Sequence, residues 1–252
     1  MVCDFRNFVY KSQVFSENST TQFVTRRRCL LGRWITENFM NNELMNRLGS
    51  YSTCQAADAF DKLKIRGHMP DIILLSPDSD YRMVGEAHTV RMVPAGGGPL
   101  PKREVHHIDA APERSIVVIS IPPGVTTANW GGMMTTRAKV MNLGGVVLDG
   151  RARDIEEHRQ MGFPVFARGV SVHGSGGYTV PIAVGEPINC GGVAVRQGDV
   201  ILGDVNGVVV IPRERLGEVI DKMDELAEIE ERITSELEKG ASIGDTFAKY
   251  RS

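Results

Sequence analysis

Glycine is the feature that most constrains the fold of this 252-residue chain. The sequence contains 27 glycines, most of them between Gly85 and Gly207, and many are next to valine, isoleucine or leucine. This pattern is typical of short buried strands joined by tight turns, where the backbone must adopt positive φ or approach another segment closely. The distribution therefore excludes a helical bundle and favours a β-rich domain.

Charge and cysteine content narrow the class of protein. Lysine and arginine number 29 and aspartate and glutamate 31, and the resulting net charge of -2 argues against a nucleic-acid-binding surface. No uncharged apolar run approaches the roughly 18 residues of a membrane-spanning helix. The 4 cysteines are scattered without a CxxC pair, so neither a zinc knuckle nor a disulfide framework is expected. We therefore expect a protein of a reducing compartment, with no nucleic-acid partner and no membrane partner.

Residues 1–35 differ in composition from the rest of the chain. Basic residues, serine and threonine are frequent there, and the only acids up to Arg33 are Asp4 and Glu17. This composition resembles a mitochondrial transit peptide, although the amphipathic periodicity is poor and the apolar core of a secretory signal is missing. We expect a solvated extension or an added helix, followed by a single domain over residues 36–252. The expected location is the cytoplasm, with mitochondrial targeting as the alternative.

The hydrophobic pattern predicts an α/β arrangement in the middle of the chain. Apolar residues at helical spacing alternate there with short apolar runs, which is typical of helices layered on a sheet. Residues 115–121 form the clearest run, because a continuous apolar segment suits a strand buried on both faces. The expected helices are 37–48, 53–60, 128–142 and one that begins at 153, and the expected strands are 71–77, 84–93, 115–121, 144–150 and 164–171.

The C-terminal part is expected to begin with β structure and to end in a long helix. Residues 192–211 are rich in valine and glycine, and residues 197–199 (QGD) suit the turn of a hairpin. From Pro212 to about Lys239, apolar residues recur at helical spacing on an otherwise charged segment. Pro212 in the first turn and Gly240 after the last turn suit the two ends of this helix.

The junction between the strand at 144–150 and the following helix combines residues suited to a catalytic site. Ligands of open α/β structures collect at the carboxyl ends of strands, and a helix N-terminus adds free N–H groups for anions. Asp154, Glu157 and His158 lie at i, i+3 and i+4, so we expect them on one helix face. Two carboxylates there suit a hard divalent cation that keeps several waters, and Arg153 suits a substrate carboxylate. The alternative is helix capping, since acids in a first turn favour the macrodipole.

The segment WGGMM, residues 130–134, is a second candidate. Gly131 and Gly132 stand at a predicted helix start, followed by Met133 and Met134. Adjacent glycines at such a position leave N–H groups accessible to an anion. The alternative is close packing of the helix, for which glycine is equally suitable.

The spacing of these residues resembles a family signature. Gly132 is followed after 20 residues by Arg153 and Asp154, and after two more by Glu157. This is similar to the G-X20-R-D-X2-E/D signature of the class II pyruvate aldolases, which cleave 4-hydroxy-4-methyl-2-oxoglutarate and 4-carboxy-4-hydroxy-2-oxoadipate. These aldolases share a family with the regulator of ribonuclease activity A. Further blocks agree in order, namely residues 58–59, 85–90, 164–169, 191–193, 197–199 and 203–212.

This resemblance implies both a fold and an active site. The implied fold is a β-rich α/β sandwich similar to the phosphohistidine swivelling domain, the RraA-like fold, assembled as a homotrimer or hexamer with sites between subunits. The resemblance implies Mg²⁺ or Mn²⁺ at Asp154, partly through water, with Glu157 in the water shell. It also implies that Arg153 and the backbone of residues 131–134 bind the pyruvoyl unit of a small 2-oxo acid.

The activity that the resemblance implies is that of a metal-dependent carbon–carbon lyase. Retro-aldol cleavage of such substrates and decarboxylation of oxaloacetate both pass through a pyruvate enolate. Asn206 stands where the family often has aspartate, and His173 and Tyr178 lie in a Gly-rich loop expected to line the site or reach a neighbouring subunit. Two alternatives stay open, a tailoring enzyme of a biosynthetic pathway and a non-catalytic regulator of an RNA-processing protein.

Overall fold

The computed structural model describes residues 43–78, 81–96 and 104–251. The predicted N-terminal extension and residues 37–42 of the first predicted helix lie outside this part of the chain. Residues 43–48 are helical, and Leu44–Ser252 form one compact unit. The next helix, α2 (Thr53–Leu63), starts at the predicted place because Ser52 and Gln55 form a reciprocal capping box.

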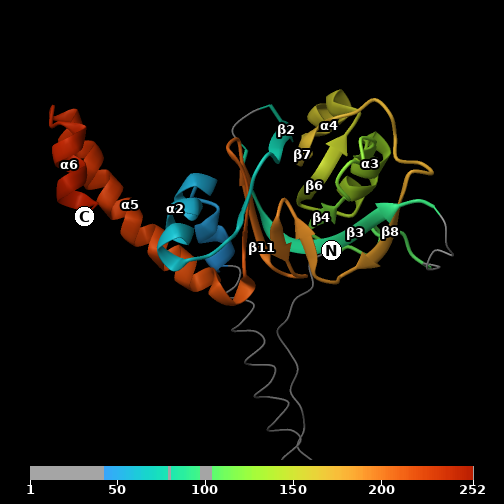
Figure 1. The fold of residues 1–252 in the computed structure, drawn as a ribbon, viewed down its shortest axis with the longest axis horizontal. Coiled ribbons are helices and arrows are strands. Elements are labelled where there is room, and N and C mark those ends of the chain that lie inside the picture. The colour runs from blue at the N-terminus through green and yellow to red at the C-terminus, as the bar shows by residue number, and fades with distance from the viewer. Residues whose placement is uncertain (1–42, 79–80, 97–103, 252) are drawn as a thin grey trace, which may run out of the picture. The chain divides into compact units, whose positions relative to one another are not determined.

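A mixed sheet of ten strands forms the centre of this unit. Its strands are β1 (His68–Met69), β2 (Ile73–Ser76), β3 (Met83–Pro94), β4 (Ile116–Ser120), β5 (Ala128–Trp130), β6 (Gly145–Ala152), β7 (Val165–Val170), β8 (Thr179–Val184), β11 (Val200–Asp204) and β12 (Gly207–Ile211). The main path runs β1-β12-β11-β3-β4-β6-β7-β2, with β5 beside β6 and β8 beside β3. The first part of β3 pairs antiparallel with β11 and the following part pairs parallel with β4, so this long strand joins the two halves (Figure 1).

The parallel strands β4, β6 and β7 are covered on both faces. Helices α3 (Gly132–Val140) and α4 (Ile155–Met161) pack on one face, where Leu148 and Trp130 belong to one apolar cluster (Figure 1). The opposite face packs on the small sheet of β9 (Ile188–Cys190) and β10 (Val193–Val195), with Phe166 in its cluster. Burial on both sides explains why these strands are continuous apolar runs in the sequence.

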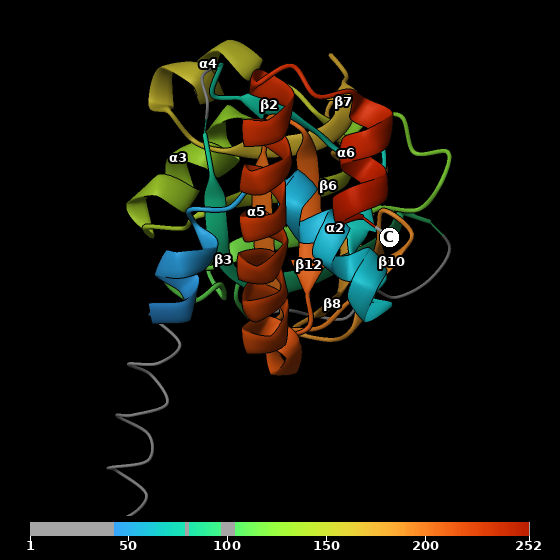
Figure 2. The same cartoon turned by 90° about the vertical axis from the view of Figure 1, so that its left-hand side faces the viewer.

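A third cluster lies between the β11–β12 hairpin and the helices α2 and α5 (Leu216–Glu238). The predicted long helix is confirmed, although a short 3₁₀ turn, η1 (Arg213–Arg215), precedes it. After Gly240 the chain forms one more helix, α6 (Ile243–Tyr250), which packs on α5 (Figure 2). Among the described residues, no helix combines the length and the apolar character needed to cross a bilayer.

Two local predictions are wrong. Residues 128–130 are not helical but form β5, which pairs with β6, and α3 begins only at Gly132. Residues 197–199 form a turn with Gly198 at φ 84°, but the strands on either side do not pair with each other. Instead β10 pairs with β9, and β11 pairs with β12 and β3.

Candidate active site

Two glycines at the start of α3 bring the backbone close to two carboxylates. A Cβ on Gly131 would lie 2.7 Å from Oδ2 of Asp154, and a Cβ on Gly132 would lie 1.6 Å from Oε2 of Glu157. Any side chain at either position would push these groups away. The glycines therefore do more than permit helix packing, because they let both predicted metal ligands approach the first turn of α3.

Asp154 points its carboxylate toward α3. It has φ 59° and ψ 43°, a left-handed conformation that aspartate tolerates better than most residues, and it precedes α4. Its side chain makes no capping hydrogen bond to its own helix, and Oδ2 accepts one from the Gly132 N–H at 2.9 Å. The alternative of helix capping therefore fails for Asp154. Glu157 does lie in the first turn of α4, where an acid is favourable to the helix dipole.

Arg153 lies between Asp154 and the Gly-rich loop. Its Nε is 3.4 Å from Oδ2 of Asp154, and its backbone N–H donates to the Trp130 carbonyl at 2.9 Å. A Cβ on Gly174 would lie only 2.8 Å from Nη1, so the loop backbone contacts the guanidinium directly. Because 39% of the Arg153 side chain is exposed, a dissolved anion can reach it.

These residues line a cavity of about 500 Å³. Residues 174–176 of the Gly-rich loop supply one wall. The loop is attached where the Ala128 N–H donates to the His173 carbonyl at 2.7 Å. The rings of His173 and Tyr178 meet edge to face, 4.8 Å apart between centroids. The lining residues are Ala128, Asn129, Trp130, Gly131, Gly132, Met133, Met134, Arg153, Asp154, Gly174, Ser175 and Gly176.

Of the residues predicted for the site, Arg153, Asp154 and residues 131–134 line the cavity, whereas Glu157, His158, His173 and Tyr178 do not. Glu157 is an exposed residue, and its carboxylate lies over Gly132 outside the lining of the cavity. The structure also narrows the choice of backbone donors. The N–H of Gly132 donates to Asp154 and that of Met134 donates to the Gly131 carbonyl, so Met133 carries the first-turn N–H with no partner among the described residues.

His158 differs from the expectation of one shared helix face. Its side chain is fully buried, and Nδ1 lies 3.0 Å from Oγ1 of Thr135 in α3. Burial lowers the pKa of His158, against the opposing effects of the Arg153 backbone carbonyl and of the carboxylates of Asp154 and Glu157. His158 therefore belongs to the support behind the cavity. Sequence reasoning missed its partner Thr135, which no motif or spacing marks.

Comparisons with known proteins show the family to which this chain belongs. The family model named RraA-like, described as Aldolase/RraA, matches residues 53–210, more than half of the chain. The chain belongs to the RraA-like family. MJ0644 of Methanocaldococcus jannaschii, called an uncharacterized protein, is 34% identical over 207 residues, which cover 81% of this chain and 93% of that relative.

Two other relatives are matched over part of their length. DlpA of Legionella pneumophila is 30% identical over 217 residues, 85% of this chain but 35% of DlpA, so the chain spans about a third of that protein. A Halalkalibacterium halodurans protein named "Putative 4-hydroxy-4-methyl-2-oxoglutarate aldolase" is 35% identical over 141 residues, 56% of this chain and 65% of the relative.

Solved structures confirm the predicted RraA-like α/β fold. An uncharacterized protein from Pseudomonas syringae superposes with a TM-score of 0.71 at 29% identity, covering 81% of this chain and 96% of that one. RraAS2 of Streptomyces coelicolor, described as an unusual member of the RNase ES inhibitor RraA family, gives a TM-score of 0.65 at 26% identity, with coverages of 75% and 94%.

Proposed function

We propose that this RraA-like chain is a divalent-metal-dependent carbon–carbon lyase that acts on small 2-oxo acids. The observation that carries the proposal is the position of Arg153 and Asp154, side by side in an accessible cavity and against the backbone of Gly131 and Gly132. A cation beside a partly available carboxylate suits a substrate whose carboxylate is next to a carbonyl. The aldolase name of the Halalkalibacterium relative supports the same reaction class.

The oxygen donors fit a hard divalent cation. Oδ2 of Asp154 accepts from Gly132, whereas Oδ1 has no partner among the described residues, so one carboxylate oxygen is available. Glu157 places a second carboxylate nearby, over Gly132. The described part of the chain contains no group of three or more His, Cys, Asp or Glu side chains placed to hold a metal. Few protein ligands, all of them oxygen, favour an ion that keeps its waters, Mg²⁺ or Mn²⁺, over zinc.

When bound, such an ion would supply Lewis acidity at the 2-oxo group. The residues of the chain bind and orient the substrate. Arg153 holds the substrate carboxylate through its planar guanidinium, whose orientation is limited by Asp154 on one side and Gly174 on the other. The N–H of Met133 offers a hydrogen bond to a substrate oxygen that gains negative charge.

One bond change is common to the proposed substrates. In 4-hydroxy-4-methyl-2-oxoglutarate and in oxaloacetate, the carbon–carbon bond one atom away from the 2-oxo carbonyl breaks. Its electron pair passes into the enolate of pyruvate, which then takes up a proton. In the retro-aldol reaction the 4-hydroxyl group gives up its proton as its carbon becomes the carbonyl carbon of the second product. The second product is pyruvate in the retro-aldol reaction and carbon dioxide in the decarboxylation. One site that stabilises the enolate thus serves both reactions.

We also expect a second subunit to cover the mouth of this cavity, in a homotrimer or hexamer. Met133 is 80% exposed, and Val172 and Tyr178 of the adjacent loop are 98% and 52% exposed. Large apolar side chains grouped around a site are commonly covered by a partner. Light scattering on the intact protein tests this, and a species of 27.7 kDa alone would contradict it.

The second candidate is a non-catalytic regulator of an RNA-processing protein. The observation that favours it is the likeness to RraAS2, which is described as a member of an RNase inhibitor family. A regulator would bind its ribonuclease through surface residues and would tolerate loss of the cavity carboxylate. An Asp154→Asn variant that inhibits a ribonuclease of the RNase E type as well as the unchanged protein does would favour this candidate.

The deciding experiment measures pyruvate release from oxaloacetate and from 4-hydroxy-4-methyl-2-oxoglutarate. We expect turnover with Mg²⁺ or Mn²⁺, loss of turnover in EDTA, and recovery when either ion is restored. Glu156→Gln is the matched control for Asp154→Asn, because it removes the same charge from an exposed residue in the first turn of α4. Full turnover after exhaustive chelation, or no turnover of either substrate with either ion, would contradict the proposal.

A further inference from the structure

Behind the cavity, three buried polar side chains form a hydrogen-bonded chain that the proposed function does not use. Nε1 of Trp130 donates to Oγ1 of Thr135 at 2.8 Å, and the same oxygen lies 3.0 Å from Nδ1 of His158. Trp130 is 2% exposed and the other two residues are 0% exposed. Polar groups buried this deeply are costly unless they are hydrogen-bonded, so the chain constrains the packing of all three residues.

The chemistry of these groups limits which of them donates and which accepts each hydrogen bond. An indole N–H can only donate, so the Thr135 oxygen accepts from Trp130 and its hydroxyl hydrogen is left to donate. Among the described residues, Nδ1 of His158 is the acceptor within reach of this hydroxyl. Donation of this hydroxyl hydrogen to Nδ1 requires the neutral tautomer of His158 with its proton on Nε2.

Each of the three residues belongs to a different element that carries part of the candidate site. Trp130 is the last residue of β5, directly before the two glycines. Thr135 lies one turn into α3, which those glycines begin, and His158 lies one turn into α4, which follows Asp154. The hydrogen-bonded series Trp130–Thr135–His158 therefore links the three backbone segments on which the hydrogen bond from the Gly132 N–H to Asp154 depends.

We infer that Thr135 and His158, joined to Trp130, are positioning residues that hold the Asp154 carboxylate against Gly132 in the orientation needed to bind a divalent cation. Neither Thr135 nor His158 lines the cavity, so both act through the backbone of the elements they connect. The inference rests on the proposed function for the identity of the ligand. The linkage of β5, α3 and α4 is independent of it.

A role in packing alone has a different consequence. Loss of a buried hydrogen bond lowers stability wherever it occurs in the protein. A positioning role predicts, in addition, weaker binding at a site that the altered side chain does not touch. Residues that support metal ligands typically change metal affinity by about 10- to 100-fold when they are removed. Metal affinity measured beside stability therefore separates the two roles.

The experiment uses Thr135→Val, which keeps the shape of the side chain and removes the hydroxyl, with Thr135→Ser as the variant that restores it. Thr53→Val is the matched control, because buried Thr53 at the start of α2 donates its hydroxyl to Asp204 in β11, at 2.7 Å. Titration calorimetry of the intact protein with Mn²⁺ alone gives the Kd, and a thermal melt gives the Tm. Hydrogen–deuterium exchange of the free protein follows the amides of residues 131–135 and 153–158.

We expect Thr135→Val to raise the Kd for Mn²⁺ about tenfold and to speed amide exchange in both segments. Thr135→Ser should bind Mn²⁺ within about twofold of the unchanged protein, and Thr53→Val should lower the Tm with an unchanged Kd. The inference is overturned if Thr135→Val binds Mn²⁺ like the unchanged protein, or if Thr53→Val weakens binding to the same extent.

Failure of the proposed function gives a distinguishable result. If the unchanged protein neither binds Mn²⁺ nor releases pyruvate, the lyase assignment is wrong and the exchange experiment decides the linkage by itself. Faster exchange in residues 131–135 and 153–158 of Thr135→Val, with none in Thr53→Val, would then support the linkage. Unchanged exchange in Thr135→Val would overturn it.

Discussion

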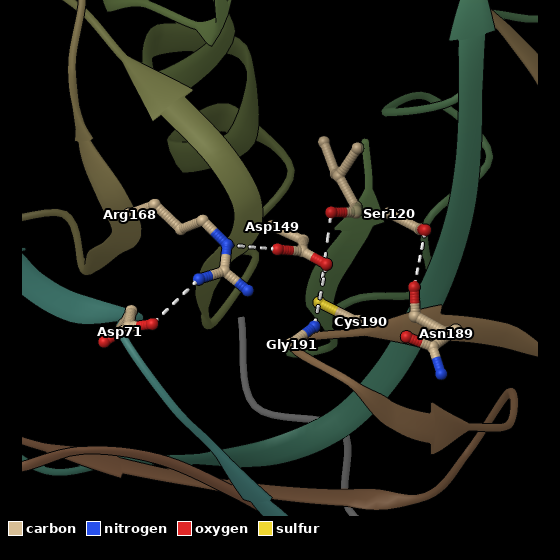
Figure 3. Close-up of polar contacts among 8 residues, drawn as sticks. Asp71, Ser120, Asp149, Arg168, Asn189, Cys190 and Gly191 are labelled. Carbon is tan, nitrogen blue, oxygen red and sulfur yellow. Dashed lines mark hydrogen bonds and ion pairs between the residues drawn. The ribbon is translucent and has the colours of Figure 1, made fainter. Parts of the chain in front are cut away.

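Two arginine–aspartate pairs, Arg168–Asp149 and Arg153–Asp154, lie near the end of β6. They differ in how many oxygens of the aspartate carboxylate accept a hydrogen bond. Asp149 accepts from Nε of Arg168 at 2.5 Å and from the Gly191 N–H at 2.8 Å, so both oxygens have partners (Figure 3). Asp154 has one such partner, the Gly132 N–H, and Arg153 is further away, at 3.4 Å. The Asp149 side chain is 16% exposed and that of Asp154 is 34% exposed.

The difference makes Arg168–Asp149 a structural pair, whereas Arg153–Asp154 is a pair that is available to a ligand. Asp149 connects β6 to β7 through Arg168 and to the turn after β9 through Gly191. Next to it, burial raises the pKa of the Cys190 thiol far above its ordinary range, so this thiol stays neutral. Asp154 instead presents a partly satisfied carboxylate to a cavity. Residue type alone does not distinguish the two pairs, whereas their unoccupied hydrogen-bonding capacity does.

The largest expected effect comes from removing one carboxylate of each pair. Asp154→Asn should lower kcat by at least about 100-fold, the scale of losing one preorganised electrostatic group, with a nearly unchanged Tm. Asp149→Asn should instead lower the Tm and leave kcat nearly unchanged, because it removes the charge that pairs with Arg168 and Asp149 does not line the cavity. Steady-state kinetics and thermal melts of both variants test this comparison. Wild-type turnover of a confirmed substrate by a folded Asp154→Asn variant would show that the active site lies elsewhere.

A smaller effect is expected from exchanging each arginine for lysine. Arg153→Lys keeps the charge but loses the planar fork, so orientation of the substrate carboxylate should suffer. We expect a raised KM and a lower kcat, together about tenfold in kcat/KM, because this contact exists before and during the transition state. Arg168→Lys should lower the Tm and leave both kinetic constants unchanged. Equal kinetic losses in the two variants would remove the distinction between the pairs.

Gly132→Ala tests how the backbone positions the available pair. The added methyl would collide with Glu157, which must then move away from the first turn of α3. We expect about tenfold weaker Mn²⁺ binding, measured by calorimetry, because a group near the cation is displaced. Gly217→Ala in α5 is the control, since a Cβ there meets nothing within 4 Å and alanine favours a helix. An unchanged Mn²⁺ affinity in Gly132→Ala would exclude Glu157 from the metal site.

Much of the fold could be predicted because its central strands are long and apolar. The strands β3 and β4 and the helices α2 and α5 lie where periodicity predicts them. The strand β8 was missed for a physical reason, since Pro181 argues against a strand and is tolerated only because β8 pairs on one side, with β3. The three-residue strand β5 is too short to show a period, and α6 lies beyond the long helix with which the domain is expected to end.

The candidate site was predictable through residue types and their spacing, not through their conformations. Nothing in the sequence indicates that Asp154 is left-handed and bonded to α3, since its position equally suits a helix cap. Nor does it indicate that His158 turns inward to Thr135, because spacing alone places it on the face of Glu157. Both features depend on the contact between α3 and α4, which only the folded chain establishes.

The smallest expected effect is a pH dependence of the free energy of unfolding, to which the buried histidine behind Asp154 contributes and Asp149 does not. His158, behind Asp154, is buried and its pKa is lowered, chiefly by desolvation, from its ordinary value of 6.5. Below pH 6.5 the unfolded chain therefore takes up a proton that the folded chain does not. The stability present above pH 6.5 is lost as the pH falls toward and through the folded pKa, with a slope below about 1.4 kcal/mol per pH unit for one group. His88 has a lowered pKa for the same reason and adds to the slope.

Urea denaturation between pH 7.5 and 5 measures this slope as a change in the free energy of unfolding. His158→Gln should reduce the slope without removing it, because His88 still contributes. Asp149→Asn, which alters the structural pair and no histidine, should lower the stability by a similar amount at each pH and leave the slope unchanged. A His158→Gln variant with the slope of the unchanged protein would mean that the folded chain protonates His158 as readily as the unfolded chain does. The buried neutral ring would then be no part of the support behind Asp154, and the contrast between the two pairs would rest on their carboxylates alone.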